Sequence, residues 1–108
     1  MKTIVTLLAA AATVTFAAGA HAADAGKAEA LAKASGCFAC HTVDKKLIGP
    51  GYKEIADKYR KDQNAEASLI KKVKEGGKGV WGDIPMMPSA HMKDEDIKTL
   101  VQWILSIK

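Results

Sequence analysis

Both cysteines of this 108-residue sequence and one of its three histidines lie within five consecutive positions, Cys37-Phe38-Ala39-Cys40-His41. This spacing is the attachment signature of c-type haem. Two thiols three positions apart on one helical turn can each bond to one of the two vinyl groups of the haem, and the next residue then lies under the iron. We therefore expect one covalent haem c at Cys37 and Cys40, with His41 as the proximal iron ligand.

Two other uses of the cysteine pair have to be compared with haem attachment. A redox disulfide of the thioredoxin kind needs a βαβ context, and no strand-rich pattern precedes Cys37. A structural zinc site needs four ligands. Once the N-terminal segment described below has been removed, only His91 remains to join Cys37, Cys40 and His41. Haem attachment is the favoured interpretation.

The N-terminal residues 1–22 have the features of a secretory signal peptide. Lys2 gives a positive start, residues 4–18 are apolar, and Ala20-His21-Ala22 has the small-x-small pattern of a cleavage site. The apolar run is too short for a comfortable transmembrane helix, although an uncleaved tether is the alternative. We expect cleavage after Ala22, export to the periplasm as a soluble protein, and no stable membrane insertion.

The remaining residues, 23–108, are expected to form one small domain with few large apolar side chains. With both cysteines in one turn, no disulfide framework can support this thin core, whereas a covalently fixed, largely apolar haem can. The net charge of +4 falls by one when Lys2 leaves, and charges of both signs are interspersed. No nucleic-acid partner is expected, because a nucleic-acid-binding protein of this size normally carries a dense basic stripe.

Alanine content and a capping Asp24 predict the first of four helices, and apolar periodicity predicts the other three. Their ranges are 24–35, 52–60, 65–75 and from 94 to the C-terminus. The first helix is rich in alanine, so another helix can cross it closely. The last helix has a broad apolar stripe, which we expect to pack across the first helix and beside the haem.

Two loops between these helices contain further candidate site residues. In the loop 42–51, the carbonyl of Pro50 can accept the second ring N–H of His41, as haem-ligating histidines require. The loop 78–92 is expected to supply the other axial ligand, because it holds two prolines and three methionines. These residues alone leave Met86, Met87 and Met92 open as thioether ligands, and His91 as the ligand of a bis-histidine haem. Trp81 in the same loop is either a core residue or a donor to a haem propionate.

Four segments give the sequence a resemblance to the short bacterial class I cytochromes c, of the pseudomonad type that donates electrons to nitrite reductases. They are Gly-Cys-Phe-Ala-Cys-His at 36–41, Ile-Gly-Pro-Gly-Tyr at 48–52, Gly-Val-Trp-Gly-Asp-Ile-Pro-Met at 79–86, and Leu-Val-Gln-Trp-Ile-Leu-Ser at 100–106. The resemblance implies an all-α fold of four to five helices wrapped around one haem. It also implies that Met86, which follows Trp-Gly-x-Ile-Pro, is the sixth ligand, although Met87 stands where that family usually has proline. Pro50 would accept from His41, and Trp81 would contact a propionate.

The function implied is that of a monomeric one-electron carrier, not an enzyme, which shuttles electrons between an electron-donor complex and a terminal reductase or oxidase. Two alternatives remain: a haem subunit of a larger oxidoreductase complex, or a haem enzyme or sensor with a labile sixth ligand. We also expect Lys33, Lys45 and Lys46 to lie near the rim of the haem site and to attract an acidic redox partner.

Overall fold

The computed structural model describes residues 9–13 and 24–108 of the chain. Apart from residues 9–13, which form neither helix nor strand, the predicted signal peptide and its cleavage site lie outside the described residues. Within the described ranges, no helix has both the length and the apolar character needed to cross a membrane.

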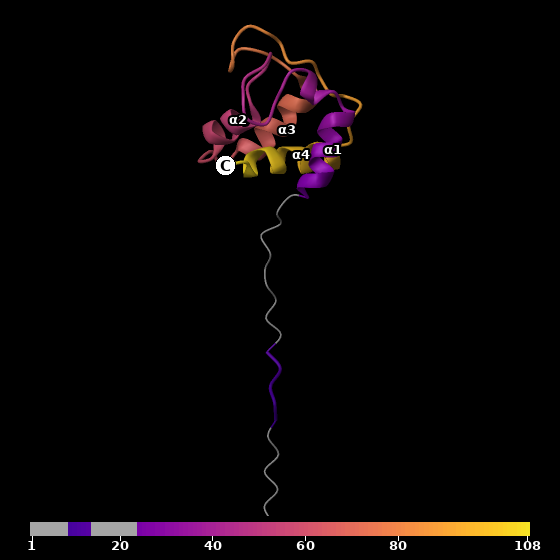
Figure 1. Ribbon diagram of the computed structural model, residues 1–108, viewed down its shortest axis with the longest axis vertical. Coiled ribbons are helices and arrows are strands. Elements are labelled where there is room, and N and C mark those ends of the chain that lie inside the picture. Colours follow the sequence, from indigo (N-terminus) through magenta and orange to yellow (C-terminus); the bar gives the residue numbers. More distant parts are fainter. Residues whose placement is uncertain (1–8, 14–23) are drawn as a thin grey trace, which may run out of the picture.

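The predicted all-α architecture is confirmed (Figure 1). Four α-helices follow one another as α1 (Ala25–Ala34), α2 (Tyr52–Tyr59), α3 (Ala65–Glu75) and α4 (Asp94–Ser106), with a short 3-10 helix, η1 (Cys37–Ala39), after α1. Across residues 9–13 and 24–108, the only β-type pairings are two isolated bridges, His41 with Lys46 and Gly77 with Met86. The helix bounds differ from the predicted ones by at most two residues.

Local sequence determines where the first helix begins and where the chain turns toward the cysteines. Asp24 caps α1, since its side-chain oxygen accepts the backbone N–H of Lys27 at 3.1 Å. After α1, Gly36 adopts a left-handed conformation with φ +77°, which glycine reaches without a steric penalty. The chain therefore leaves α1 sharply and enters the turn that contains both cysteines.

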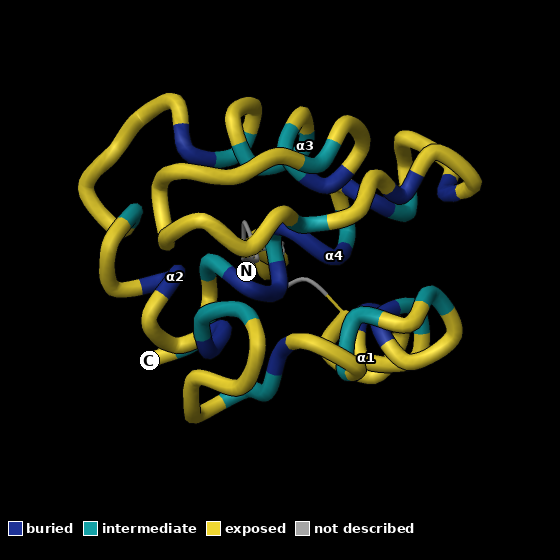
Figure 2. The backbone as a smooth tube through the Cα atoms, turned by 90° about the horizontal axis from the view of Figure 1, so that it is seen from above, coloured by how far each residue is buried: buried dark blue, intermediate teal, exposed yellow. Residues whose placement is uncertain are grey.

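The core of the protein lies around α4, which packs against α1, α2 and α3 (Figure 2). The predicted crossing of α1 by α4 is confirmed, and Ala28 and Ala32 of α1 are fully buried. Small side chains at these two positions let the helix backbones approach closely. The buried residues of α4 are Ile97, Leu100, Val101, Trp103 and Ile104.

The long connection between α3 and α4, residues 76–92, which we call the strap, arches beyond the helices (orange in Figure 1). Two hydrogen bonds join its first and middle parts: Gly77 N–H to Met86 O at 3.0 Å and Met86 N–H to Gly77 O at 2.8 Å. A third bond, Ser89 N–H to Val73 O at 2.9 Å, fastens it to α3. These bonds hold a segment without helical periodicity across one side of the helix core.

Candidate haem site

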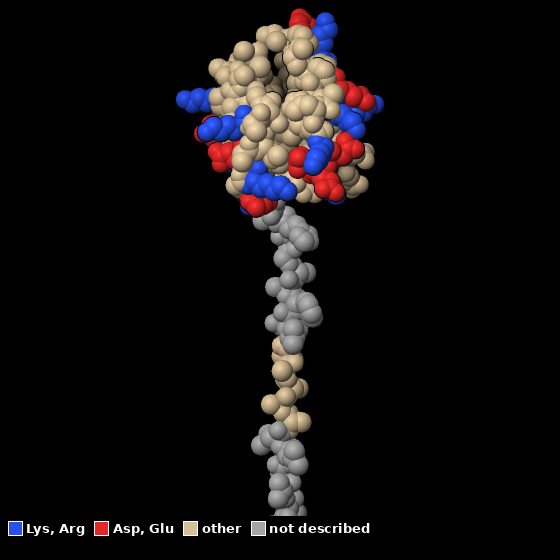
Figure 3. All heavy atoms as spheres, turned by 90° about the vertical axis from the view of Figure 1, so that its right-hand side faces the viewer, with Lys and Arg blue, Asp and Glu red and all other residues tan. Residues whose placement is uncertain are grey.

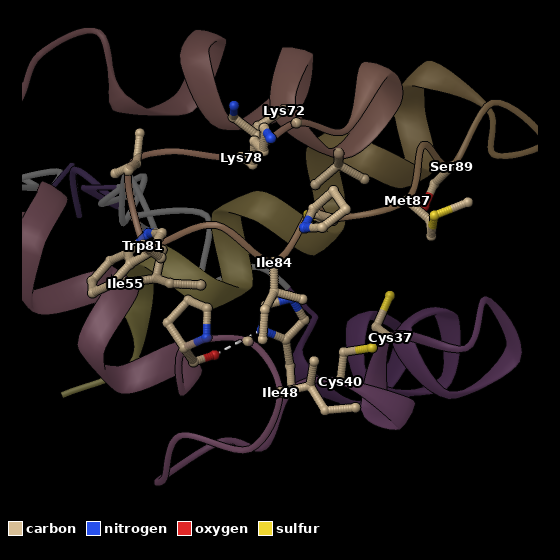
Figure 4. Close-up of a pocket in the computed structure, with 18 of the residues that line it drawn as sticks. Cys37, Cys40, Ile48, Ile55, Lys72, Lys78, Trp81, Ile84, Met87 and Ser89 are labelled. Carbon is tan, nitrogen blue, oxygen red and sulfur yellow. Dashed lines mark hydrogen bonds between the residues drawn. The ribbon is translucent and has the colours of Figure 1, made fainter.

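A cavity of about 550 Å³ lies between the strap, α2, η1 and the loop that follows η1 (Figure 4). Its lining includes all six residues that the sequence analysis selected: Cys37, Cys40, His41, Pro50, Trp81 and Met86. They are up to 49 positions apart in the sequence, so the fold itself brings them to one place. Cavities that bind small molecules and cofactors measure about 300–1,000 Å³.

The two cysteines lie together on one side of the cavity, in the turn formed by η1 (Figure 4). The carbonyl of Cys37 accepts the backbone N–H of Cys40 at 3.2 Å and that of His41 at 3.0 Å, which closes the turn. Cys37 is half-buried and Cys40 is exposed, and neither forms a disulfide. Burial raises the pKa of the Cys37 thiol, and the neighbouring Tyr52 hydroxyl opposes part of that shift.

The His41 side chain is buried, and its ring is fixed by a hydrogen bond to the following loop. His41 Nδ1 lies 2.7 Å from the carbonyl oxygen of Pro50 (dashed in Figure 4). Because a carbonyl oxygen can only accept, the proton of the neutral ring is on Nδ1 and the lone pair is on Nε2. Nε2 is thus the nitrogen available to a metal, and Pro50 provides the second contact that haem-ligating histidines usually make.

Gly49 also contributes to the position of this ring, and the sequence analysis did not identify it. A Cβ atom added at Gly49 would lie 2.7 Å from His41 Cε1 and 3.0 Å from Nδ1. Any side chain at position 49 would therefore push the imidazole away from its place. The available signal was a glycine immediately before the proline whose carbonyl had been selected.

The structure separates the four candidates for the sixth ligand. Met86, Met87 and His91 line the cavity, whereas Met92 is 8% exposed and belongs to the hydrophobic core. Met87 is 75% exposed, while Met86 is half-buried, packs against the core and is held by its two backbone bonds to Gly77. Of the two methionines that line the cavity, Met86 is the one whose position is better fixed.

Trp81 stands on the side of the cavity opposite the cysteines, together with Ile55 (Figure 4). It is 42% exposed, so the core does not enclose it, and Lys58 Nζ of α2 lies 5.5 Å from the centre of its ring. This distance is within the range of a cation–π contact. Lys72 and Lys78 lie near each other at the edge of the same cavity (Figure 4). The cavity thus combines an apolar wall with cationic groups at one edge.

The residues present fit a haem. Five of the large apolar side chains that are exposed on the chain's surface line this cavity: Ile48, Val80, Trp81, Ile84 and Met87. A large apolar group in the cavity removes this surface from water, at about 25 cal/mol for each Å². The two thiols, the imidazole lone pair on Nε2 and the thioethers are suitable ligands and attachment points, and the lysines suit the two carboxylates of a haem.

Comparison with known proteins decides the family. The family model described as cytochrome c matches residues 23–108. The chain belongs to the cytochrome c family. Cytochrome c-551 of Allochromatium vinosum is 51% identical over 77 residues, which cover 71% of this chain and 82% of the relative. Cytochrome c-551 of Pseudomonas aeruginosa is 48% identical over 80 residues, covering 74% and 76%.

Solved structures agree with this assignment. The crystal structure of wild-type Nitrosomonas europaea cytochrome c552 superposes with a TM-score of 0.72 at 46% identity and covers 74% of this chain and 99% of its own. That of the class 1 cytochrome MtoD from Sideroxydans lithotrophicus gives 0.70 at 42% identity, covering 78% and 96%. The chain therefore has the class I cytochrome c fold and binds haem c covalently. It is an electron-transfer cytochrome and not an enzyme.

Proposed function

We propose that this cytochrome carries single electrons between redox proteins of the bacterial periplasm, with its haem bonded to Cys37 and Cys40 and the iron ligated by His41 and Met86. When bound, the haem supplies an iron that changes between Fe(II) and Fe(III). The observation that carries the proposal is the convergence of both thiols, the imidazole lone pair on Nε2 and a half-buried thioether on one cavity.

The chain's residues set the properties of the iron. The Pro50 carbonyl keeps the His41 proton on Nδ1, so the lone pair of Nε2 is free to bind the iron. The soft thioether of Met86 favours Fe(II) and raises the reduction potential. With both His41 and Met86 holding the iron, no position on it would be open to a substrate, which supports a carrier over a haem enzyme or sensor. Trp81, Lys72 and Lys78 are the lining residues suited to hold the propionates.

Substitution of Met86 tests the ligand set. Met86→Ala should abolish the near-infrared band of Met–Fe(III) ligation and lower the reduction potential, because the ligand that favours Fe(II) is lost. Met87→Ala is the matched control and should keep both, since Met87 is 75% exposed. Loss of the band in Met87→Ala alone would assign the ligand to Met87. Retention in both variants would point to His91 instead.

We further propose that redox partners dock at the mouth of the cavity. Five exposed apolar side chains line it, and Lys46 is among the lining residues, whereas Lys33 and Lys45 are not. Figure 3 shows a hollow surrounded by uncharged atoms, with charged side chains on the flanks. This arrangement suits a partner with an apolar contact surface and acidic groups around it, which long-range attraction would steer into place.

Charge reversal tests this docking surface. Lys46→Glu should slow the second-order electron-transfer rate to an acidic partner and leave the reduction potential nearly unchanged. The difference from the parent should shrink as ionic strength rises above about 0.1 M, where the Debye length is about 10 Å. Lys98→Glu on α4, outside the cavity lining, is the control for charge alone. Equal slowing by Lys98→Glu, or no dependence on salt, would contradict docking at this rim.

Export to the periplasm is proposed from the N-terminal segment together with the haem motif. The mass of the purified holoprotein provides the check: it should equal residues 23–108 plus one haem. A mass that includes residues 1–22 would indicate a retained tether.

A further inference from the structure

Tyr52, the first residue of α2, lies at a junction of aromatic side chains. Its ring centre is 5.2 Å from that of His41 with an interplanar angle of 26°, which is a stacked arrangement. It is also 6.0 Å from the ring of Phe38, between the two cysteines, and 5.7 Å from Trp103 of α4, in an edge-to-face contact. One side chain therefore contacts the haem-binding turn on one side and the helix core on the other.

The backbone places Tyr52 for this role. It is the first residue of α2, two positions after Pro50, and its backbone N–H donates to Thr42 O at 2.9 Å. The side chain is only 2% exposed. Tyr52 is thus an enclosed aromatic ring beside the imidazole.

The His41 ring is held from three directions. In its plane, Nδ1 donates to the Pro50 carbonyl at 2.7 Å. Gly49 leaves room for Cε1 and no more, because a Cβ there would lie 2.7 Å from that atom. Against its face lies the ring of Tyr52. The hydrogen bond alone leaves the imidazole free to rotate about the axis from Nδ1 to the Pro50 oxygen, and the stacked Tyr52 ring prevents that rotation.

We propose that Tyr52 is a positioning residue for the iron ligand. It fixes the plane of the His41 imidazole by stacking on it, and its own ring is held against the helix core by contact with Trp103. The proposal rests on the proposed function, in which His41 Nε2 ligates the iron. Offset or tilted aromatic pairs of this kind contribute about 0.5–1.5 kcal/mol beyond the area that they bury. The ring of Tyr52, and not its hydroxyl, carries the role.

The test uses the holoprotein in its Fe(II) form and measures solvent exchange of the His41 Nδ1 proton by NMR. Tyr52→Leu keeps an apolar side chain but removes the aromatic ring, so exchange should accelerate by about tenfold, as expected for a bond that opens more often. Tyr52→Phe keeps the ring and should exchange at the parent rate. Ile97→Ala is the control for general loss of stability, because Ile97 is fully buried in α4 and does not line the cavity; it should also keep the parent rate.

Three results would overturn the proposal: a parent-like rate in Tyr52→Leu, an equal acceleration in Ile97→Ala, or an equal acceleration in Tyr52→Phe. If Tyr52→Leu yields no holoprotein, Trp103→Leu takes its place. That variant removes the edge contact which holds the Tyr52 ring and should accelerate exchange by severalfold, whereas no change would overturn the proposal. Failure of the proposed function has a different signature: His41 ring protons without the ring-current shifts of a haem in every variant, the parent included, would show that His41 does not ligate the iron.

Discussion

Helix α4 and the strap are adjacent in sequence but keep their shapes by different means. Five of the thirteen residues of α4 are buried, and its backbone is hydrogen-bonded within the helix. The strap holds four of the protein's five glycines with positive φ and four of its six exposed large hydrophobic residues, counted over residues 9–13 and 24–108. Many interchangeable contacts maintain α4, whereas a few backbone hydrogen bonds hold the strap, and its exposed apolar side chains line the cavity that the haem would fill.

The largest effect is expected when covalent attachment is prevented, because this removes the partner of the strap's apolar side chains. Cys37→Ala/Cys40→Ala should lose most of the free energy of unfolding, which is about 5–15 kcal/mol for a typical domain. The ordering cost is on the order of 1.5 kcal/mol per residue, and the helix core is thin. Circular dichroism should show low helix content, and proteolysis should be rapid. A cooperative thermal transition with full helix content would contradict this contrast between α4 and the strap, because the packed helices would then be stable without the haem.

A smaller effect is expected from two glycines of the strap that differ in their surroundings. Gly76 has φ +70°, and a Cβ there would meet the Met86 carbonyl oxygen and the Pro88 nitrogen. Gly79 has φ +108° and open space around it. Backbone strain of about 1–3 kcal/mol is expected for alanine at either position. Only Gly76→Ala should also displace Met86.

The two alanine variants are distinguished by the iron spectrum as well as by stability. Gly76→Ala should weaken or remove the near-infrared Met–Fe(III) band and lower the melting temperature by more than Gly79→Ala does. Gly79→Ala should keep the band. If both variants kept it, the contact between Gly76 and Met86 would have no part in holding the ligand.

The same contrast explains what the sequence could predict. The bounds of α3 followed from apolar periodicity and those of α2 did so to within one residue, because a helix repeats one local rule along its length. Cys37, Cys40 and His41 were selected by their spacing within a single turn, and all three line the cavity. How far each methionine is exposed did not follow from the residues, because it depends on the backbone bonds that shape the strap, among them those of Met86 with Gly77 and of Ser89 with Val73.

The junction at Tyr52 was beyond sequence analysis for a related reason. Tyr52 is the first residue of the predicted helix 52–60, and it is buried. Its neighbours Phe38, His41 and Trp103 come from three separate parts of the chain. The angles between these rings arise only when the helices pack, so a pattern along one helix contains no information about them.

The smallest effect is expected where the strap begins and ends, since an ion pair joins its two flanking helices. Lys74 near the end of α3 lies 2.8 Å from a carboxylate oxygen of Asp94, the first residue of α4, and both side chains are at least half exposed. The hydrogen bond to Asp94, followed by its charge, raises the pKa of Lys74. Because the pKa of Lys74 is higher in the folded protein, protonation of this lysine stabilises the fold. The contribution is fully present below the pKa of the unfolded chain, about 10.4, and it is lost as the pH rises through the higher folded value.

Lys74→Met should therefore lower the melting temperature only slightly at neutral pH, because exposed ion pairs contribute little. The difference from the parent should shrink at high salt and disappear as the pH rises above about 10.4. Lys71→Met, on the same helix and exposed, is the matched control and should show no such pH dependence. The measurement is the melting temperature of both variants and the parent across pH 7–11. A large, pH-independent loss in Lys74→Met would mean that the ends of the strap are held by the packing of the lysine side chain, and the strap would then resemble α4 more closely than its glycines suggest.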